Sequence, residues 1–364
     1  MYSRLRVCAA CARRFCFGAP VRARVSATAI GAQDASSSTP PTPESERLLS
    51  ELQAETATLA ADMRTHLTPD SAPDKLSLMM RHHLDAPGKL VRPLLVLLVS
   101  HVCNAGPPAC QRQRTVAIVT EMIHSASLIH DDLIDGSDLR RGAASVQSRF
   151  GHRDAVLAGD HMIGVASQLL AGTGHPLVVR GMATAISDLV RGELDQLGET
   201  GDLSRYLART YRKTAALLAH SAKCAAVLAP GSSPATAAAA FELGRSIGMA
   251  FQLVDDLLDF EASDGQLGKP AGAADLRRGV LTGPVLFAMQ TCPQLRAAVA
   301  RRLSRPGDLQ LALDSVARAD GVGQTRMLAQ LHCREAHWQL SQLPAVPASE
   351  ALHSLIDRLL NRQH

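Results

Sequence analysis

Two acidic motifs of the same form constrain this chain more than any other feature of its sequence. Residues 131–135 and residues 255–259 both read Asp-Asp-x-x-Asp. Each residue of an α-helix turns the chain by about 100°, so the first and fifth positions of the motif differ by only about 40°. The two outer carboxylates of each motif therefore share one helical face, and the second Asp flanks that face.

The neighbours of both motifs indicate that the carboxylates lie on largely buried helices. Apolar residues dominate residues 122–129, before the first motif, and residues 251–260, around the second. A single acidic triplet on a helix is usually a solvated face, but buried like charges are unfavourable unless a cation compensates them. Two such faces opposed across a helical bundle would hold several divalent ions. Mg²⁺ prefers oxygen ligands and keeps waters or substrate phosphates in its other positions, so the pattern predicts a site for Mg²⁺ and diphosphate.

The composition favours an all-α fold. Of the 364 residues, 46% are hydrophobic and only 3% are aromatic, and Gly and Pro fall mostly between helical patterns. No alternating strand pattern of useful length is present. No apolar run reaches the ~18 residues needed to cross a bilayer, so we expect a soluble or peripheral protein. Helices are predicted, to within a few residues, at 44–66, 74–84, 91–103, 114–135, 153–171, 175–198, 203–229, 234–260, 284–304, 308–318, 321–343 and 348–361.

The N-terminal segment differs in composition from the rest of the chain. Residues 1–33 contain six Arg and neither Lys nor an acidic residue. Because the whole chain has a net charge of +4, the remainder carries −2, and nucleic acid is not an expected partner. An Arg-rich, acid-free start is typical of a mitochondrial transit peptide, with a plastid-type organelle as the alternative. We expect residues 1–40 to be a transit peptide and flexible linker, and residues 41–364 to be a single all-helical domain.

Several basic side chains stand where they would bind diphosphate. Lys89 and Arg92 lie three apart at a predicted helix start, where the helix dipole favours anions. His124 lies two helical turns before the first motif and on the same side, and Arg140 and Arg141 follow the motif. Taken alone, each is also a common surface or core residue, so the prediction rests on their joint order. Further along the chain, Lys213 and Thr214 lie within a mostly apolar predicted helix, and Lys269 follows the second motif.

With these residues in view, the chain resembles the trans-type polyprenyl diphosphate synthases, most closely the catalytic long-chain subunits that make the ubiquinone side chain. The resemblance covers roughly residues 45–364. One departure is Pro87, where the family usually has a second Gly, and another is Arg277-Arg278-Gly279-Val280, where many members have a Lys after the Gly. The matching stretches are GKLVRP (88–93), HDDLIDGSDLRRG (130–142), AGD (158–160), GE (192–193), KT (213–214), FQLVDDLLDF (251–260), GKP (268–270), DL (275–276) and TGPVLFA (282–288).

The resemblance implies a helical bundle around a central cavity and a role for each matching residue. It implies Mg²⁺ as the cofactor, with three ions per active site. The residues implied to bind Mg²⁺ directly are Asp131, Asp135 and Asp255, and those implied to support them are Asp132, Asp256 and Asp259. Isopentenyl diphosphate would be held by Lys89, Arg92, His124 and Arg141, and the allylic diphosphate by Arg140, Lys213 and Lys269. The residues implied to line the reacting centre are Thr214 and Gln252.

The expected reaction is the head-to-tail condensation of isopentenyl diphosphate with allylic diphosphates. Ser127 and Ala126, four and five residues before the first motif, would lie about one helical turn deeper along the growing tail. Both are small, whereas short-chain enzymes of the family often have an aromatic residue at that depth. The prediction is therefore a long product of roughly eight to ten isoprene units by family resemblance.

Other interpretations stay open beside this one. One is a short-chain farnesyl or geranylgeranyl diphosphate synthase, and another is a subunit that is active only with a partner subunit. A terpene cyclase is disfavoured by the second Asp-Asp-x-x-Asp motif, and a catalytically inert scaffold by the intactness of both motifs. The resemblance further implies a homodimer or heteromer in mitochondria, in the matrix or at the periphery of the inner membrane.

Overall fold

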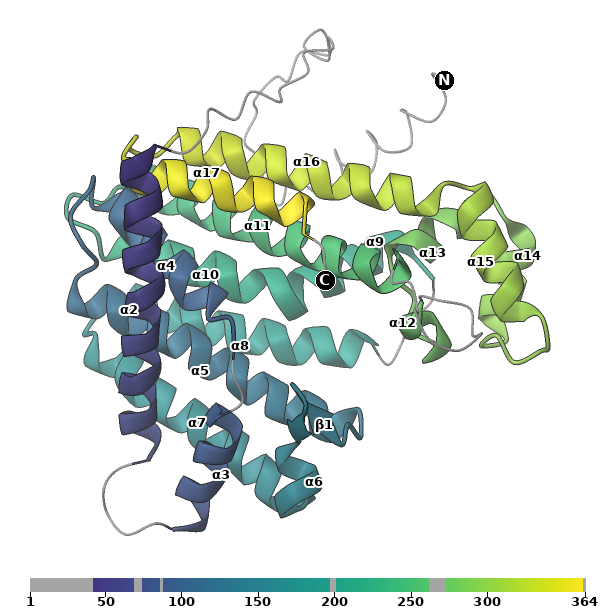
Figure 1. The fold of residues 1–364 in the computed structure, drawn as a ribbon, viewed down its shortest axis with the longest axis horizontal. Coiled ribbons are helices and arrows are strands. Elements are labelled where there is room, and N and C mark those ends of the chain that lie inside the picture. Colours follow the sequence, from purple (N-terminus) through teal and green to yellow (C-terminus); the bar gives the residue numbers. More distant parts are fainter. Residues whose placement is uncertain (1–41, 69–73, 86–87, 197–200, 262–272, 363–364) are drawn as a thin grey trace, which may run out of the picture.

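The computed structural model describes residues 42–68, 74–85, 88–196, 201–261 and 273–362. Over these ranges the regular structure is helical apart from one short hairpin, so the predicted all-α fold is confirmed. None of the helices described there is both long and apolar enough to span a bilayer. The elements, labelled as in Figure 1, are α2 (Pro43–Leu67), α3 (Lys75–Asp85), α4 (Val91–Cys103), α5 (Gln111–Ile134), β1 (Leu139–Arg140), β2 (Ala143–Ala144), α6 (Val146–Phe150), α7 (His152–Gly172), α8 (Pro176–Gln196), α9 (Leu203–Thr210), η1 (Tyr211–Ala215), α10 (Ala216–Val227), α11 (Pro234–Glu261), α12 (Ala274–Arg277), α13 (Gly283–Met289), α14 (Pro293–Ala300), α15 (Asp308–Arg318), α16 (Gly321–Ser341) and α17 (Pro347–Leu360).

Two hydrophobic cores lie one after the other along the molecule. The larger core is formed mainly by α2, α4, α5, α7 and α10, and the smaller one by α9, α13 and α15 with the second half of α11. The long helices α11 and α16 contribute to both cores, and Figure 1 shows them running along the length of the bundle. Apolar burial on both sides therefore holds α11, which carries the second acidic motif.

Small residues let the helices around the site approach closely. A Cβ on Gly244 of α11 would lie 2.5 Å from the Leu218 carbonyl oxygen, and one on Gly248 would lie 2.5 Å from the Cα of Ala215. A side chain at Gly244 would push α10 away from α11, and one at Gly248 would push η1 away. The absence of side chains there brings the second motif next to the η1 segment, which carries Lys213 and Thr214.

A hairpin and two helix breaks differ from the sequence prediction. A hairpin pairs β1 with β2 directly after the first motif, with Arg141 and Gly142 at its turn, at φ values of 51° and 80°. Two successive positive φ values are the geometry of a tight hairpin turn, which two-residue strands do not reveal as an alternating pattern. The helix expected at 203–229 is divided by the π-helical turn η1, and the helix expected at 284–304 is divided before Pro293.

Candidate active site

The first acidic motif lies at the C-terminal end of α5, where it forms the last turn and the residue that caps the helix. The end of a helix carries partial negative charge, which disfavours carboxylates. Burial raises the pKa of Asp131 to about 6; the charge of Lys213 opposes this rise, and those of Glu193 and Asp135 add to it. Asp135 itself is exposed. The local field therefore favours a cation beside Asp131.

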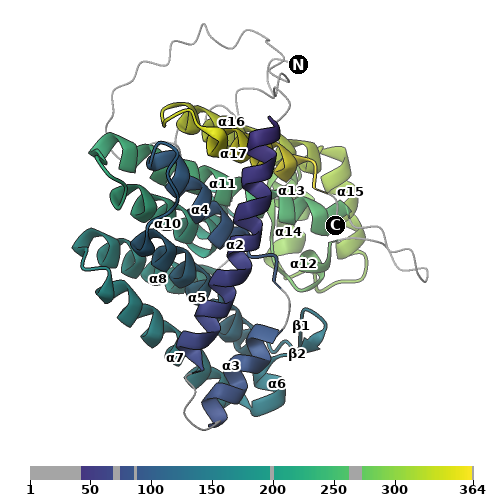
Figure 2. The same ribbon diagram turned by 60° about the vertical axis from the view of Figure 1, so that its left-hand side comes forward.

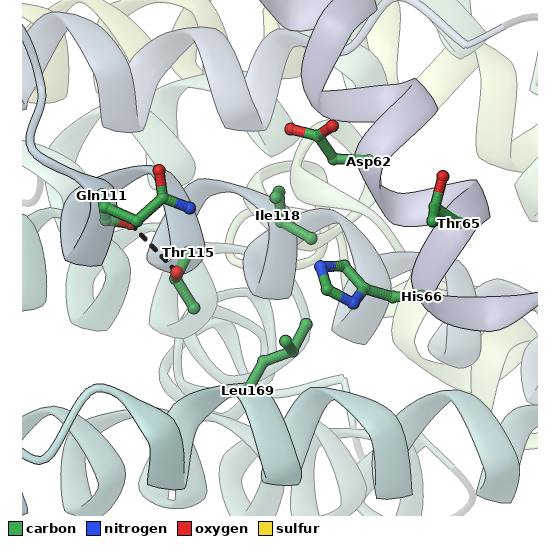
Figure 3. Close-up of a pocket in the computed structure, with 7 residues that line it drawn as sticks. All are labelled: Asp62, Thr65, His66, Gln111, Thr115, Ile118 and Leu169. Carbon is green, nitrogen blue, oxygen red and sulfur yellow. Dashed lines mark hydrogen bonds between the residues drawn. The ribbon is translucent and has the colours of Figure 1, made fainter. Parts of the chain in front are cut away.

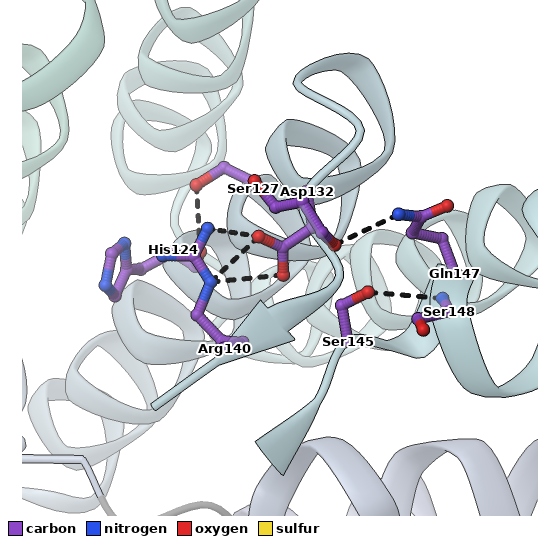
Figure 4. A network of polar contacts seen from close by, with 8 residues as sticks. His124, Ser127, Asp132, Arg140, Ser145, Gln147 and Ser148 are labelled. Atoms are coloured by element: carbon purple, nitrogen blue, oxygen red, sulfur yellow. Dashed lines mark hydrogen bonds and ion pairs between the residues drawn. The ribbon is translucent and has the colours of Figure 1, made fainter. Parts of the chain in front are cut away.

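The second carboxylate of this motif points into the protein. Asp132 is 2% exposed, and Arg140 on β1 donates from Nε to both of its oxygens, at 2.9 and 3.1 Å (Figure 4). The hydrogen bond to Asp132 raises the pKa of Arg140. Nearby, Gln147 of α6 donates to the Ser137 carbonyl at 3.0 Å, which holds the loop between α5 and the hairpin. The hairpin thus places the expected allylic-diphosphate residue Arg140 directly on the first motif.

The second motif occupies the last turns of α11, and its three carboxylates have different partners. Asp255 pairs with Nη1 of Arg362, which follows α17, at 2.8 Å. Asp256 is 3% exposed and accepts hydrogen bonds from the Tyr206 hydroxyl and from Nε2 of Gln252, the latter at 3.0 Å. Asp259 accepts a backbone hydrogen bond at 3.2 Å. Burial raises the pKa of all three carboxyls, that of Asp256 to about 6.

The η1 turn places Lys213 and Thr214 between the two motifs. Single π-helical turns of this kind often occur at functional sites. Lys213 forms an ion pair with Glu193 of α8, and its charge lowers the pKa of Asp131. Thr214 donates to Oε1 of Gln252 at 2.8 Å. A Cβ on Gly192 would lie 2.9 Å from the Lys213 backbone nitrogen, so α8 and η1 are in close contact here.

The residues predicted to hold isopentenyl diphosphate gather at the start of α4. Arg92 lies in its first turn, and the residue before the helix, Leu90, has a left-handed backbone with φ of 47°. The guanidinium of Arg141 lies against the loop, because a Cβ on Gly88 would be 2.8 Å from its Nη1. Burial holds the pKa of His124 well below its ordinary value, and the charges of Arg92 and Arg141 lower it further.

This cationic group faces the second motif. Burial raises the pKa of Asp255, and the charges of Arg92 and Lys89 oppose this rise; burial lowers the pKa of Arg92, and the charge of Asp255 opposes this fall. In the first motif, the charge of Lys213 likewise opposes the rise that burial causes in the pKa of Asp131. The basic residues and the acidic motifs, predicted from separate stretches of sequence, therefore lie around one site. Lys269 lies outside the described residues, so the structure does not place it.

Sequence reasoning missed several charged and polar residues of this site. Glu121 is 6% exposed on α5, and the charges of Arg92 and Arg141 act on it. Tyr206 and Arg362 bind the second motif directly. An acid within the apolar run of α5 was a readable signal for Glu121, whereas no local pattern marks Tyr206 or Arg362.

Within the described ranges, no three His, Cys, Asp or Glu side chains converge closely enough to hold a metal ion by themselves. The outer carboxylates nevertheless provide the hard oxygen ligands that Mg²⁺ and Ca²⁺ prefer. An ion bound here would take its remaining ligands from water or from substrate phosphate oxygens.

A separate pocket of 330 Å³ opens between α2, α5 and α7 (Figure 3). Asp62 and His66 of α2 lie on one side, and Ile118 of α5 and Leu169 of α7 lie at its apolar part. Ile118 precedes Asp131 by 13 residues, or about 20 Å along the helix at about 1.5 Å per residue. The pocket is thus remote from the acidic motifs, and we assign it no role in their chemistry.

Comparison with known proteins decides the family. Residues 73–316 match the family model described as polyprenyl synthetase. The chain belongs to the polyprenyl synthetase family. It is an enzyme, a trans-prenyltransferase, as the resemblance of its motifs predicted.

Three relatives of this synthetase are informative. The human all trans-polyprenyl-diphosphate synthase PDSS1 is 41% identical over 312 residues, which cover 84% of this chain and 74% of the relative. The decaprenyl-diphosphate synthase subunit 1 of Schizosaccharomyces pombe is 38% identical, with 78% and 83% covered. The probable mitochondrial hexaprenyl pyrophosphate synthase of Neurospora crassa is 38% identical, with 78% and 74% covered.

Solved structures of the family have the same fold. A decaprenyl diphosphate synthase from Rhodobacter capsulatus superposes with a TM-score of 0.78 at 29% identity, covering 87% of this chain and 98% of that one. A polyprenyl synthase from Caulobacter crescentus, in complex with calcium and isoprenyl diphosphate, gives 0.76 at 30% identity, with 88% and 98% covered. The bundle expected from the sequence is therefore the fold of this family.

Proposed function

We propose that this synthetase makes a long-chain all-trans polyprenyl diphosphate, for the ubiquinone side chain, by Mg²⁺-dependent condensation of isopentenyl diphosphate with allylic diphosphates. The observation that carries the proposal is the meeting of two acidic motifs with cations from α4 and η1 in one space. The long-chain names of the human, fission yeast and Neurospora relatives support the product class.

The proposed metal site lies between the ends of α5 and α11. Asp131, Asp135 and Asp255 would bind the ions directly, three per active site, and Asp259 would support them from the same face of α11. Asp132 and Asp256 would support the motifs from inside the protein, since their oxygens accept hydrogen bonds there. The Caulobacter relative, in complex with calcium and isoprenyl diphosphate, supports a divalent ion at such a site.

The chain's own residues would bind, orient and shield the substrates. The residues proposed for isopentenyl diphosphate are Lys89, Arg92, His124 and Arg141, and those for the allylic diphosphate are Arg140, Lys213 and Lys269. Thr214 and Gln252 would line the reacting centre. Apolar residues of α5 and α11 would exclude water, which otherwise quenches a carbocation.

The proposed reaction is ionisation followed by alkylation. Bound divalent cations supply charge that stabilises the leaving diphosphate. The allylic carbon–oxygen bond breaks, and its electron pair leaves with the diphosphate. The double bond of isopentenyl diphosphate, oriented by the α4 cations, attacks the allylic carbocation and forms the new carbon–carbon bond. Loss of a proton to the released diphosphate then gives a chain that is longer by five carbons.

The proposed setting is mitochondrial, as the name of the Neurospora relative supports. The transit peptide proposed at residues 1–40 lies outside the described residues, and residues 41–364 would form the catalytic domain. We further propose a homodimer, or a heteromer with a second synthase subunit, with peripheral membrane association. The word subunit in the name of the fission yeast relative supports an assembly of more than one chain.

A product assay tests the proposal. Purified residues 41–364 would be incubated with Mg²⁺, farnesyl or geranylgeranyl diphosphate and labelled isopentenyl diphosphate, and the products separated by length. A ladder that ends in a long polyprenyl chain is expected. A main product of fifteen or twenty carbons would favour the short-chain alternative. A folded protein without product would favour dependence on a partner subunit, which co-expression with a second subunit would then test.

A further inference from the structure

A hydrogen-bond network, half-buried at Thr214 and Gln252 and buried at Tyr206, connects the second acidic motif to the segment that carries Lys213. Thr214 of η1 donates to Oε1 of Gln252 at 2.8 Å, and Nε2 of Gln252 donates to Oδ1 of Asp256 at 3.0 Å. The hydroxyl of Tyr206, on α9, donates to Oδ2 of the same carboxylate. Both oxygens of Asp256 are thus bound by neutral donors of the protein interior.

Tyr206 is itself fixed by its surroundings. It is 3% exposed within the smaller hydrophobic core. The guanidinium of Arg209 lies over its ring at 5.6 Å, and Nη2 of Arg209 donates to the Leu281 carbonyl at 3.1 Å. A buried phenol this well held has little freedom to release Asp256.

Helix geometry gives this contact a consequence for the motif. Asp255 and Asp259 are four residues apart and share one face of α11, whereas Asp256 is turned from Asp255 by about 100°. Gln252 lies one turn before Asp256, on the same inward side. A donor that holds Asp256 inward therefore adds to the apolar packing that sets the rotation of α11 about its axis, and with it the direction of the other two carboxylates.

We infer that Tyr206 is a positioning residue of the active site: its hydroxyl holds Asp256 inside the protein and so aims Asp255 and Asp259 at the metal and diphosphate. The inference rests on the proposed function of the second motif. A parallel in the first motif supports it, because Asp132 is held inward by Arg140 in the same way. In both motifs the second carboxylate is buried, and an internal donor from another element binds it.

Tyr206→Phe tests the inference, since it removes the hydroxyl and keeps the ring. The full chain would be titrated with Mg²⁺ in the presence of inorganic diphosphate by calorimetry. We expect Mg²⁺ binding to weaken about tenfold, because loss of a group that orients metal ligands typically lowers metal affinity by about ten- to a hundredfold. Tyr211→Phe is the matched control, because burial and the charges of Asp188, Arg245, Glu242 and Arg212, none of them in the motifs, act on Tyr211. Unchanged binding in Tyr206→Phe would overturn the inference.

A double-mutant cycle separates positioning from general packing. If Tyr206 acts through Asp256, Tyr206→Phe has almost no additional effect on Mg²⁺ binding in the Asp256→Asn background. Additive effects would show that the hydroxyl acts by another route, and would also overturn the inference.

Asp255→Ala tests the underlying site in the same titration. If Asp255→Ala binds Mg²⁺ normally, the proposed site itself fails. If it loses binding and Tyr206→Phe does not, only the role of Tyr206 fails.

Discussion

At the scale of single residues, the carboxylates of the two motifs are divided between two environments. Asp132 and Asp256 are almost fully buried, and they accept hydrogen bonds from Arg140 and from Tyr206 with Gln252. The outer carboxylates lie nearer the surface and face cationic side chains. This division separates the carboxylates expected to bind metal from those that connect α5 and α11 to neighbouring elements by hydrogen bonds.

The first prediction concerns the outer carboxylates. Asp131→Ala or Asp255→Ala should lower turnover by several orders of magnitude, because each removes a proposed ligand at the place where charge develops on the leaving diphosphate. Steady-state kinetics at saturating Mg²⁺ measure this effect, and circular dichroism checks that the helices persist. Asp314→Ala, at an exposed position of α15, serves as the control. Near-normal turnover in either active-site variant would refute the metal assignment.

The second prediction concerns the pKa of Asp131, which burial raises from 3.8 to about 6. The folded chain therefore holds this proton as the pH falls below about 6, and a metal ion must displace it. Mg²⁺ affinity should fall by up to about tenfold per pH unit below that value. Without metal, the same shift stabilises the fold as the pH falls from about 6 towards 3.8. Calorimetric titration between pH 5 and 7.5 measures the affinity. Asp131→Asn should weaken this dependence, and the part that persists belongs to the second motif, where burial raises the pKa of Asp256 to about 6 as well.

At the scale of elements, α5 connects the reacting centre to the interior of the bundle. Ala126 is fully buried, and Ser127 donates to the His124 carbonyl at 2.8 Å, so neither places a large side chain along the proposed path of the tail. α7 packs against α5 so closely that a Cβ on Gly159 would lie 2.2 Å from Nε2 of His130. A larger side chain on this part of α5 therefore cannot be accommodated by a shift of α5 towards α7.

The third prediction follows from this lack of room. Ala126→Phe or Ser127→Phe should shorten the product, because an aromatic ring about one turn below Asp131 stops the growing tail early. Chromatography of the labelled products gives their lengths. Ala126→Val is the graded control and should shorten the product less. Products of unchanged length from folded Phe variants would show that the tail follows another path.

At the scale of the whole molecule, α7 and α8 lie on one side of the bundle (Figure 2), and both helices carry exposed apolar side chains. Val190 and Leu194 of α8 are 57% and 64% exposed, and Val156 and Leu157 of α7 are also exposed. Apolar side chains gathered in this way mark association surfaces in many soluble proteins. This edge is the surface that we expect to bind a second synthase chain, whether a copy of this one or a partner subunit.

The fourth prediction tests that surface. The double substitution Val190→Glu with Leu194→Glu should convert the assembly to single chains, because it would bury charge in an apolar interface. Light scattering coupled to gel filtration measures the mass. Met327→Glu, at an exposed position of α16, is the control and should leave the mass unchanged. A wild-type chain that is already monomeric, or a double variant of unaltered mass, would contradict the prediction.

Much of this molecule was predictable from sequence because its decisive patterns are local. Helical class, the pairing of carboxylates four residues apart and the order of the basic residues all follow from short-range spacing. The interruption at η1 was not predictable, since residues 211–215 read as ordinary helix. The hairpin after the first motif was also missed, because its strands are too short to show an alternating pattern.

The sequence by itself determined which residues are available for the chemistry, and it was sufficient to predict the family. Tertiary structure decided how those residues are held. Arg140 binds Asp132 across 8 positions of sequence, Tyr206 binds Asp256 across 50, and Arg362 binds Asp255 across 107. Periodicity relates only residues within a few turns of one another. The hairpin folds Arg140 back onto Asp132, and the packing of whole helices brings the two distant pairs together, so the two inward-held carboxylates become visible only in the folded chain.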